Sequence, residues 1–407
     1  MSDIIYDWNQ KGAQSPAPLR EIEVHDETLR DGIQSPTLVD PPISAKEKTI
    51  RLLTRSGVAS VNVGLPGAGP RAVADSEHLV KLIRDEGLNI RPGCAARTHP
   101  NDIRPIIEIS ERTGVPVEAM MFLGSSPIRM YAEGWDEDKL EKLTRDAVRM
   151  AVTAGIPASF VTEDTVRSSP ETLRRLFTAA IDEGADRLVL CDTVGHSTPT
   201  GVYNIVRFSV DLLKELGVSD RVKLDWHGHD DRGLSLINAM AAMEAGVDRL
   251  HGTVMGVGER VGNTPVDLLL VNLKLLGHNM GDPSALSELV TLISANCDWP
   301  VPPDYPVFGR DAFRTGTGVH AAAVIKAAKR GDDLLADMIY SGVPASWFGR
   351  KQEIEIGHMS GLSNIKYWLE SRDIPCTDKL VDEIFTLAKS GTATLSEEAI
   401  MTVVSAQ

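Results

Sequence analysis

Short runs of apolar and β-branched residues recur along the chain, and longer stretches with a helical pattern separate them. Several of the short runs lead directly into polar residues. The runs predict eight strands, at residues 21–26, 60–65, 90–95, 117–123, 158–162, 187–191, 222–226 and 249–254. The stretches between them predict helices, for example at 44–56, 136–154, 170–183, 199–216 and 233–245.

Eight strand–helix units within about 255 residues predict a (β/α)8 TIM barrel. An open doubly wound sheet is the alternative, but no GxGxxG phosphate loop follows the first predicted strand. Beyond about residue 276 the strand pattern ends, and mostly helical segments follow. The expected organisation is therefore an N-terminal extension at 1–20, a catalytic barrel at 21–277 and a smaller helical C-terminal region at 278–407.

The composition is that of an ordinary globular protein, with 42% hydrophobic and 24% charged residues in 407. The net charge of −15 disfavours nucleic acid and anionic membranes as partners. An anionic small substrate stays compatible with this charge, because a metal and a nearby arginine dominate the field of a site. There is no apolar run long enough for a membrane span, no evident signal peptide and no CxxC pair among the four cysteines. These features predict a cytoplasmic protein with reduced thiols.

Polar side chains follow three of the predicted strands, at the carboxyl ends where barrel active sites lie. Arg30 and Asp31 follow the first strand, His227 and His229 end the seventh, and Asn263 follows the eighth. These three strands are neighbours once the barrel closes. The spacing of two residues places both imidazoles on one face of the seventh strand. Imidazole nitrogens together with oxygen ligands suit a divalent cation such as Mg, Mn or Zn.

Three segments resemble the metal-dependent Claisen-condensing barrel enzymes, namely 2-isopropylmalate synthase, homocitrate synthase and citramalate synthase. The segments are residues 26–32, the His227/His229 pair and residues 258–263, and the match continues to about residue 361. The Gly-Asn ending of the third segment is more similar to isopropylmalate synthase than to homocitrate synthase. Lyases of the 3-hydroxy-3-methylglutaryl-CoA type share the metal ligands, but their cysteine-containing catalytic loop has no counterpart in this segment.

The resemblance implies an acyltransferase that condenses acetyl-CoA with a 2-oxo acid and releases CoA, leaving a 2-substituted malate. The oxo acid would chelate a divalent cation, which acts as a Lewis acid on the keto carbonyl. Arg30 would stabilise the charge that develops on the substrate oxygen. The implied metal ligands are Asp31, His227, His229 and Asn263.

The same resemblance assigns further roles beyond the metal. Glu163 stands where the family has a catalytic glutamate, and Thr193 matches a threonine that holds the carboxylate of the oxo acid. His320, and more weakly Tyr340, match acid/base residues of the C-terminal region. In the family this region reaches across a homodimer to the partner's barrel mouth, so we expect a homodimer here.

Structural roles compete with several of these assignments. Asn263 precedes Thr264-Pro265 and has the sequence of a helix N-cap. Glu163 lies four residues before Arg167, with which it could form an ion pair. Packing within the C-terminal region is an alternative role for His320 and Tyr340.

Departures from the family pattern leave the substrate open. Met120 replaces a histidine of the fourth strand, Asn62 stands where the second strand usually ends in glutamate, and Asp230 replaces an asparagine. Arg97, at the end of the third strand, would meet a carboxylate or the CoA phosphates, or form a surface salt bridge. The candidate oxo acids are 2-oxoisovalerate, pyruvate, 2-oxoglutarate and a specialised acid such as phosphonopyruvate. A metal-dependent aldolase or lyase and a non-catalytic binding barrel remain the other function classes.

Overall fold

The computed structural model describes residues 5–9, 11 and 19–406, so most of the expected N-terminal extension lies outside the described residues. The chain divides into two compact units, one that extends to Pro300 and one that begins at Val301. None of the helices in the described ranges is long and apolar enough to cross a membrane.

The first unit is a closed barrel of eight parallel strands, which confirms the predicted fold. Each strand pairs with the next in the sequence, and the last closes on the first through the register Val24 to Leu250 and His25 to His251. The strands are β1 (Glu23–Asp26), β2 (Ser60–Asn62), β3 (Arg91–Arg97), β4 (Glu118–Gly124), β5 (Ala158–Glu163), β6 (Arg187–Asp192), β7 (Lys223–Gly228) and β8 (Arg249–Gly252).

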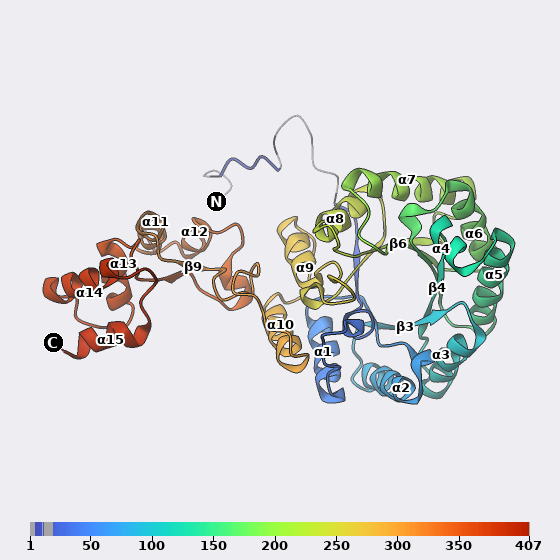
Figure 1. Ribbon diagram of the computed structural model, residues 1–407, viewed down its shortest axis with the longest axis horizontal. Helices are drawn as coiled ribbons and strands as arrows, with labels where there is room; N and C mark the ends of the chain where they lie inside the picture. The colour runs from blue at the N-terminus through green and yellow to red at the C-terminus, as the bar shows by residue number, and fades with distance from the viewer. Residues whose placement is uncertain (1–4, 10, 12–18, 407) are drawn as a thin grey trace. The chain divides into compact units, whose positions relative to one another are not determined.

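Helices follow the strands and form an outer ring around them (Figure 1). The sequence begins several of them with Ser or Thr followed by Pro, the preferred residues of a helix start. For example, the Ser169 side chain accepts a hydrogen bond from the backbone of Thr172 at the start of α6. The helices are α1 (Ile43–Arg55), α2 (Pro70–Asp85), α3 (Pro100–Thr113), α4 (Pro127–Glu133), α5 (Glu137–Thr153), α6 (Pro170–Asp182), α7 (Pro199–Glu215), α8 (Ser235–Ala245) and α9 (Val266–Leu275). Short 3-10 turns are η1 (Gly32–Gln34), η2 (Pro66–Ala68), η3 (Thr165–Arg167) and η4 (Val254–Gly256).

One further helix, α10 (Ser284–Asn296), belongs to the barrel unit, so this unit extends past the expected boundary at residue 277. Its apolar face is buried and packs against α1. Backbone bonds from Gly281 to Ser56 and from Asp282 to Arg55 fix the connection at 3.2 and 2.8 Å. The helical pattern in the sequence identifies this helix but not the surface on which it packs.

The second unit is mainly helical, as expected. Its helices are α11 (Gly318–Ala328), α12 (Asp333–Met338), α13 (Leu362–Glu370), α14 (Asp378–Ser390) and α15 (Glu397–Ser405), with the short turn η5 (Ala345–Phe348). A two-stranded parallel ladder, β9 (Arg314–Thr315) with β10 (Glu353–Ile354), was not expected from the sequence. A core that includes Ile365, Trp368 and Ile384 packs α13 and α14 together.

Charged side chains fill part of the barrel interior. The Arg249 side chain on β8 is fully buried, and its guanidinium lies 2.6 Å from Asp225 on β7 and 2.6 Å from Glu118 on β4. It also donates to the Ser60 hydroxyl at 3.0 Å. Burial alone would raise the pKa values of the two carboxyls, but Arg249 between them holds both below their ordinary range. The three charges therefore form one buried ion cluster.

We expect Arg249→Met to destabilise the barrel strongly, because it leaves the buried Glu118 carboxylate without its ion pair and Asp225 with Arg187 alone. Removing one member of a buried ion cluster costs about 3–5 kcal/mol. Urea unfolding followed by circular dichroism measures the change. Arg174→Met is the matched control, since Arg174 is a half-exposed arginine paired with Glu215 on the surface. Equal midpoints for the two variants would contradict a stabilising role of the cluster.

Candidate functional site

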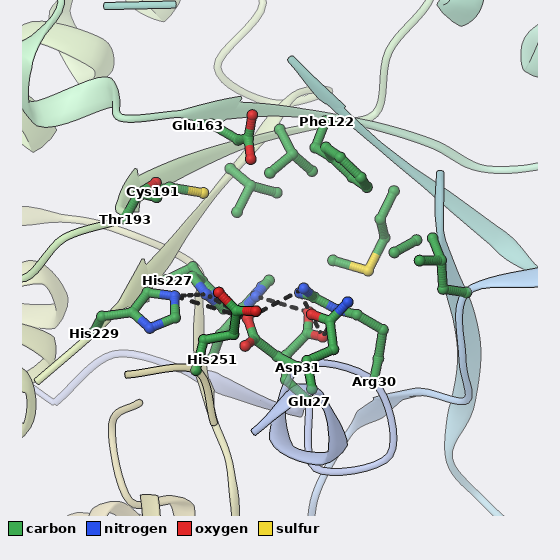
Figure 2. A pocket seen from close by; sticks show the side chains of 17 residues that line it. Glu27, Arg30, Asp31, Phe122, Glu163, Cys191, Thr193, His227, His229 and His251 are labelled. Atoms are coloured by element: carbon green, nitrogen blue, oxygen red, sulfur yellow. Dashed lines mark hydrogen bonds and ion pairs between the residues drawn. The ribbon is translucent and has the colours of Figure 1, made fainter. Parts of the chain in front are cut away.

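A cavity of about 250 Å³ opens at the carboxyl ends of the barrel strands (Figure 2). Residues on or directly after every strand line it. They are Glu27, Arg30, Asp31, Gln34, Leu65, Ala95, Met120, Phe122, Val161, Glu163, Val189, Cys191, Thr193, His227, His229, His251 and Glu259. Three of the predicted metal ligands and Arg30 are therefore together in one cavity.

Asp31, His227 and His229 form a compact group of potential ligands. The Asp31 carboxylate lies 3.3 Å from Nε2 of His227 and 3.8 Å from Nε2 of His229. The two Nε2 atoms are 3.3 Å apart. All three side chains are buried. The end of β7 and the turn after β1 thus direct two nitrogens and one oxygen toward a common point.

The protonation of His229 suits metal binding. Its Nδ1 lies 3.2 Å from the carbonyl oxygen of Gly262, which accepts a hydrogen bond only if Nδ1 carries the proton. Burial lowers the pKa of His229 to about 4, so the ring is neutral near pH 7. Its Nε2 lone pair then faces Asp31 and His227. A backbone carbonyl that fixes the tautomer in this way is typical of metal-binding histidines.

Asn263, the fourth predicted ligand, lies next to His229 but is not among the residues that line the cavity. It pairs with His229 through an isolated antiparallel bridge, and its amide nitrogen donates to the carbonyl of Val257 at 3.2 Å. Its amide oxygen is buried and has no hydrogen-bond partner among the described residues. Helix α9 begins after Pro265, so Asn263 is not its N-cap. An unpartnered buried amide oxygen next to His229, together with the Asp31 carboxylate and two imidazoles, suits a divalent cation of the Mg, Mn or Zn type.

Arg30 lies beside this group. Its guanidinium contacts Asp31 at 3.1 Å and Glu27 at 2.8 Å, and its Nε donates to the same Glu27 oxygen at 2.8 Å. Burial would lower the pKa of Arg30, but Glu27 and Asp31 raise it above its ordinary value. Burial would likewise raise the pKa of Asp31, yet Arg30 and the histidines hold it below its ordinary value. Both groups are therefore charged at neutral pH.

The sequence did not reveal a role for Glu27, which is fully buried and in contact with Arg30. Its second oxygen lies 3.2 Å from Nε2 of His25 and 3.6 Å from Nδ1 of His251. His25 and His251 pair across the β1–β8 ladder, and their rings are 4.5 Å apart. The one signal in the sequence was an acidic residue three positions before Arg30, in the segment that carries the family resemblance.

The opposite side of the cavity is mainly apolar. Met120 and Phe122 of β4 and Val161 of β5 line it, and Phe122 lies across the cavity from Asp31 in Figure 2. Asn62 is fully buried outside the lining, with its amide nitrogen 3.7 Å from the Met120 sulfur. Arg97 is outside the lining as well, because Asp102 in the first turn of α3 holds its guanidinium at 2.7 and 2.9 Å.

Glu163 and Thr193 line the cavity, as expected for substrate-contacting residues. The Thr193 hydroxyl accepts a hydrogen bond from the backbone of Asp164 at 2.8 Å. Burial raises the pKa of Glu163, whose carboxylate lies 3.9 Å from Arg129. Arg167 pairs with Asp164 instead, so the alternative ion pair with Glu163 does not form.

His320 and Tyr340 lie in the second unit. Their rings stack with centroids 4.1 Å apart and an interplanar angle of 22°. Tyr340 is about half exposed, and His320 is partly buried beside it. The C-terminal unit therefore places these two predicted acid/base residues side by side.

The fold and this cavity define a TIM-barrel protein with a candidate divalent-metal centre at the carboxyl ends of its strands. The HMGL-like family model matches residues 21–294, and the chain belongs to this family. It is 30% identical over 384 residues to the probable 2-isopropylmalate synthase of Ignicoccus hospitalis, covering 91% of this chain and 89% of that protein. It is 31% identical to the homocitrate synthase AksA of Methanothermobacter thermautotrophicus, covering 89% of this chain and 88% of that protein. The family resemblance seen in the sequence is thereby confirmed.

Solved structures share the fold at lower identity. The HMG-CoA lyase from Brucella melitensis has a TM-score of 0.56 at 18% identity and covers 68% of this chain and 99% of its own. The HMG-CoA lyase from Bacillus subtilis has a TM-score of 0.57 at 20% identity and covers 70% of this chain and 97% of its own. At these identities the likeness supports the barrel fold alone.

We expect His229→Ala to weaken the binding of a divalent cation by more than about tenfold, since even the outer partners of metal ligands contribute that much. Isothermal titration of chelator-treated protein with Mn²⁺ or Zn²⁺ measures the affinity. His78→Ala is the matched control, because His78 is an exposed histidine that contacts Glu47 on the surface. Unchanged affinity in His229→Ala would exclude this imidazole as a ligand.

Proposed function

We propose that the protein is an acyltransferase that condenses acetyl-CoA with a 2-oxo acid and releases CoA, as its relatives' names describe for 2-isopropylmalate synthase and homocitrate synthase. The observation that carries the proposal is the convergence of a carboxylate and two imidazoles beside the arginine that contacts this carboxylate, with the unpartnered amide oxygen of Asn263 next to His229. The ligands would be Asp31, His227, His229 and Asn263. A divalent cation held there would polarise the keto carbonyl of the oxo acid.

Arg30 supplies the second positive charge of the reaction. Its guanidinium lies at the cavity wall in contact with Asp31, so it is within reach of an oxygen bound near the ligand group. It donates to the substrate oxygen on which negative charge develops when the new carbon–carbon bond forms. A preorganised donor of this kind stabilises the transition state more than the ground state.

Residues on the other strands orient the oxo acid. The Thr193 hydroxyl donates to the carboxylate of the oxo acid, while its lone pair keeps the bond from the backbone of Asp164. Glu163 faces the same cavity with a raised pKa caused by burial, which is a property of carboxyls that exchange protons near neutral pH.

The cavity wall favours an oxo acid with an apolar side chain. Met120, Phe122 and Val161 give this wall no charge to pair with a second anionic group. Within the described lining Arg30 is the only arginine or lysine, and Glu27 and Asp31 already neutralise it. Nearby Arg129 is matched by Glu133 and Glu163. A branched apolar acid such as 2-oxoisovalerate therefore fits better than 2-oxoglutarate or phosphonopyruvate.

We place the base that removes a proton from acetyl-CoA on His320 of a second protomer in a homodimer. An imidazole has a suitable resting pKa for this step. The stacked Tyr340 ring fixes the orientation of the His320 ring. The residues that line the barrel cavity include histidines, but His227 and His229 are committed to the ligand group and His251 contacts Glu27 and Asp225.

A thiol-release assay across a panel of 2-oxo acids tests the reaction and its substrate. We expect CoA release with acetyl-CoA and 2-oxoisovalerate, and a kcat/KM at least about tenfold lower for 2-oxoglutarate and phosphonopyruvate, because each would bury an unpaired charge. Met120→Lys is the comparison variant, because it adds a positive charge to the apolar wall. It should reduce the difference in kcat/KM between 2-oxoisovalerate and the two acids that carry a second anionic group. Cleavage of a hydroxyacyl-CoA without consumption of acetyl-CoA would instead identify a lyase.

Mixing two inactive variants tests whether the C-terminal unit is shared. A mixed dimer of His320→Ala and Arg30→Ala chains contains one complete site if the units are exchanged. Random mixing should then restore about a quarter of wild-type activity, because half of the dimers are mixed and each has one good site. A mixture of Arg30→Ala and His229→Ala chains, both defective in the barrel, should stay inactive. Absence of recovery after verified subunit exchange would show that each chain builds its own site.

A further inference from the structure

The position of the Arg30 guanidinium is set largely by Glu27. Two nitrogens of Arg30, Nε and Nη2, lie 2.8 Å from one oxygen of Glu27, while Nη1 reaches Asp31 at 3.1 Å. An arginine side chain has several rotatable bonds and loses much rotamer freedom when it is fixed. The contacts with Glu27 therefore select one orientation of the fork, in which it faces both Asp31 and the cavity.

The position of Glu27 is in turn fixed by residues of the barrel interior. Its other oxygen faces His25 at 3.2 Å and His251 at 3.6 Å. His25 contacts the Ser60 hydroxyl at 2.8 Å, and Nε2 of His251 lies 3.1 Å from Asp225. Asp225 belongs to the ion cluster of Arg249. An unbroken series of buried polar contacts therefore leads from the barrel interior to the arginine at the cavity wall.

His25, Glu27 and His251 also have the composition of a metal site, and their facing atoms lie close together. The charges of the neighbours argue against a cation between them. Glu27 already has a positive partner in Arg30, and the carboxylate beside His251 is paired with Arg249. The three facing atoms, Nε2 of His25, Oε1 of Glu27 and Nδ1 of His251, make no hydrogen bond within the described residues. A count of bound metal therefore separates a brace for the carboxylate from a second metal centre.

We propose that Glu27, braced by His25 and His251, is the positioning residue for Arg30 in the condensation reaction. The proposal rests on the function proposed above. Glu27 also lines the cavity, but in this proposal it acts through Arg30 and not on the substrate, because one of its oxygens accepts from two nitrogens of Arg30. Its effect is to keep the fork of Arg30 aimed at the oxygen that becomes negative.

Replacing Glu27 by glutamine retains the size of the side chain and removes its charge. Arg30 then keeps Asp31 as its ion-pair partner. Glu163 and Glu259 also line the cavity, but within the described residues no ion pair or hydrogen bond joins either of them to Arg30. The fork should turn toward Asp31 and away from its working position. A misplacement of about 1 Å can reduce turnover by about a hundredfold. The KM for acetyl-CoA should change little, since the substrate does not contact Glu27.

A double-mutant cycle with turnover as the readout tests the coupling. We expect Glu27→Gln to lower kcat by about tenfold to a hundredfold, and to have no further effect in the Arg30→Ala background. Asp26→Asn is the matched control, because Asp26 is an equally buried carboxylate that accepts hydrogen bonds from Thr28 rather than from Arg30. This control should keep kcat within about twofold of the wild type. A kcat for Glu27→Gln equal to that of Asp26→Asn, or losses that multiply with Arg30→Ala, would overturn the proposal.

A second readout separates this proposal from the proposed reaction. In spectra of protein with ¹⁵N-labelled arginine, the Arg30 Nε–H signal is identified by its absence in Arg30→Ala. We expect slow solvent exchange of this hydrogen in the wild type and in Asp26→Asn, and faster exchange in Glu27→Gln. Equal exchange in all three would overturn the positioning role. The protein could instead release no CoA with any oxo acid while the Arg30 Nε–H exchange is slow and depends on Glu27. This result would contradict the proposed condensation reaction but not the positioning of Arg30 by Glu27.

Metal analysis completes the test. Wild type and Glu27→Gln should each bind one equivalent of Mn²⁺ or Zn²⁺ with similar affinity. Two equivalents in the wild type and one in Glu27→Gln would show that His25, Glu27 and His251 form a metal site, and would overturn the positioning role.

Discussion

The guanidinium of Arg249 is the charge on which the polar interior of the barrel depends. It is fully buried and contacts two carboxylates from different strands, Asp225 and Glu118. Without it, the buried Glu118 would lose its ion pair close to Asp225, which would keep Arg187 at 2.8 Å, and burial would favour protonation of Glu118. With it, both stay ionised and can serve as fixed acceptors. Asp225 then orients His251, and Glu118 accepts from the Ser159 hydroxyl at 2.5 Å.

From this cluster a series of charged and polar side chains leads to the cavity. Asp225 is followed by the imidazole of His251, then by Glu27, by Arg30 and by Asp31. Each group except the partly exposed Arg30 is buried, and each lies within 3.6 Å of the next. An opposite charge at this range favours the ionised forms of Glu27, Arg30 and Asp31. The arrangement explains how a site with so many charges remains folded in a region of low polarity. It also means that a substitution in the barrel interior would alter the positions of the charged side chains at the cavity.

Much of the fold and of the ligand group could be predicted because both follow from short-range patterns. Apolar runs identify strands, and closure of the barrel makes the ends of β1, β7 and β8 neighbours, which brings Asp31, His227 and His229 together. The positions of Asn62 and Arg97 were harder to predict. The Met120 sulfur lies 3.7 Å from the Asn62 amide, and Asp102 in the following helix pairs with Arg97. Such competition between side chains depends on exact register and rotamers, which no local pattern records.

Glu27 also shows that a local pattern does not determine the role of a side chain. Its position next to a buried aspartate and three residues before an arginine is compatible with a surface ion pair, a capping role or a buried contact. Only the closure of β8 onto β1, which places His251 beside His25, creates the pocket that makes a buried carboxylate stable there. Long-range pairing thus determines the role of a residue whose local sequence is ambiguous.

The charged and the apolar residues of the cavity come mainly from different halves of the barrel. The charged groups that bear on the reaction come mainly from β1, β7 and β8, whereas β2 to β6 contribute mainly apolar residues such as Leu65, Met120 and Val161. The apolar residues have no part in the series of charged and polar side chains from Asp225 to Asp31. A substitution among them can therefore alter which side chain of an oxo acid fits while the charges and the ligand group keep their positions. This separation gives a physical reason why barrels of one family can act on different oxo acids with a common set of charged residues.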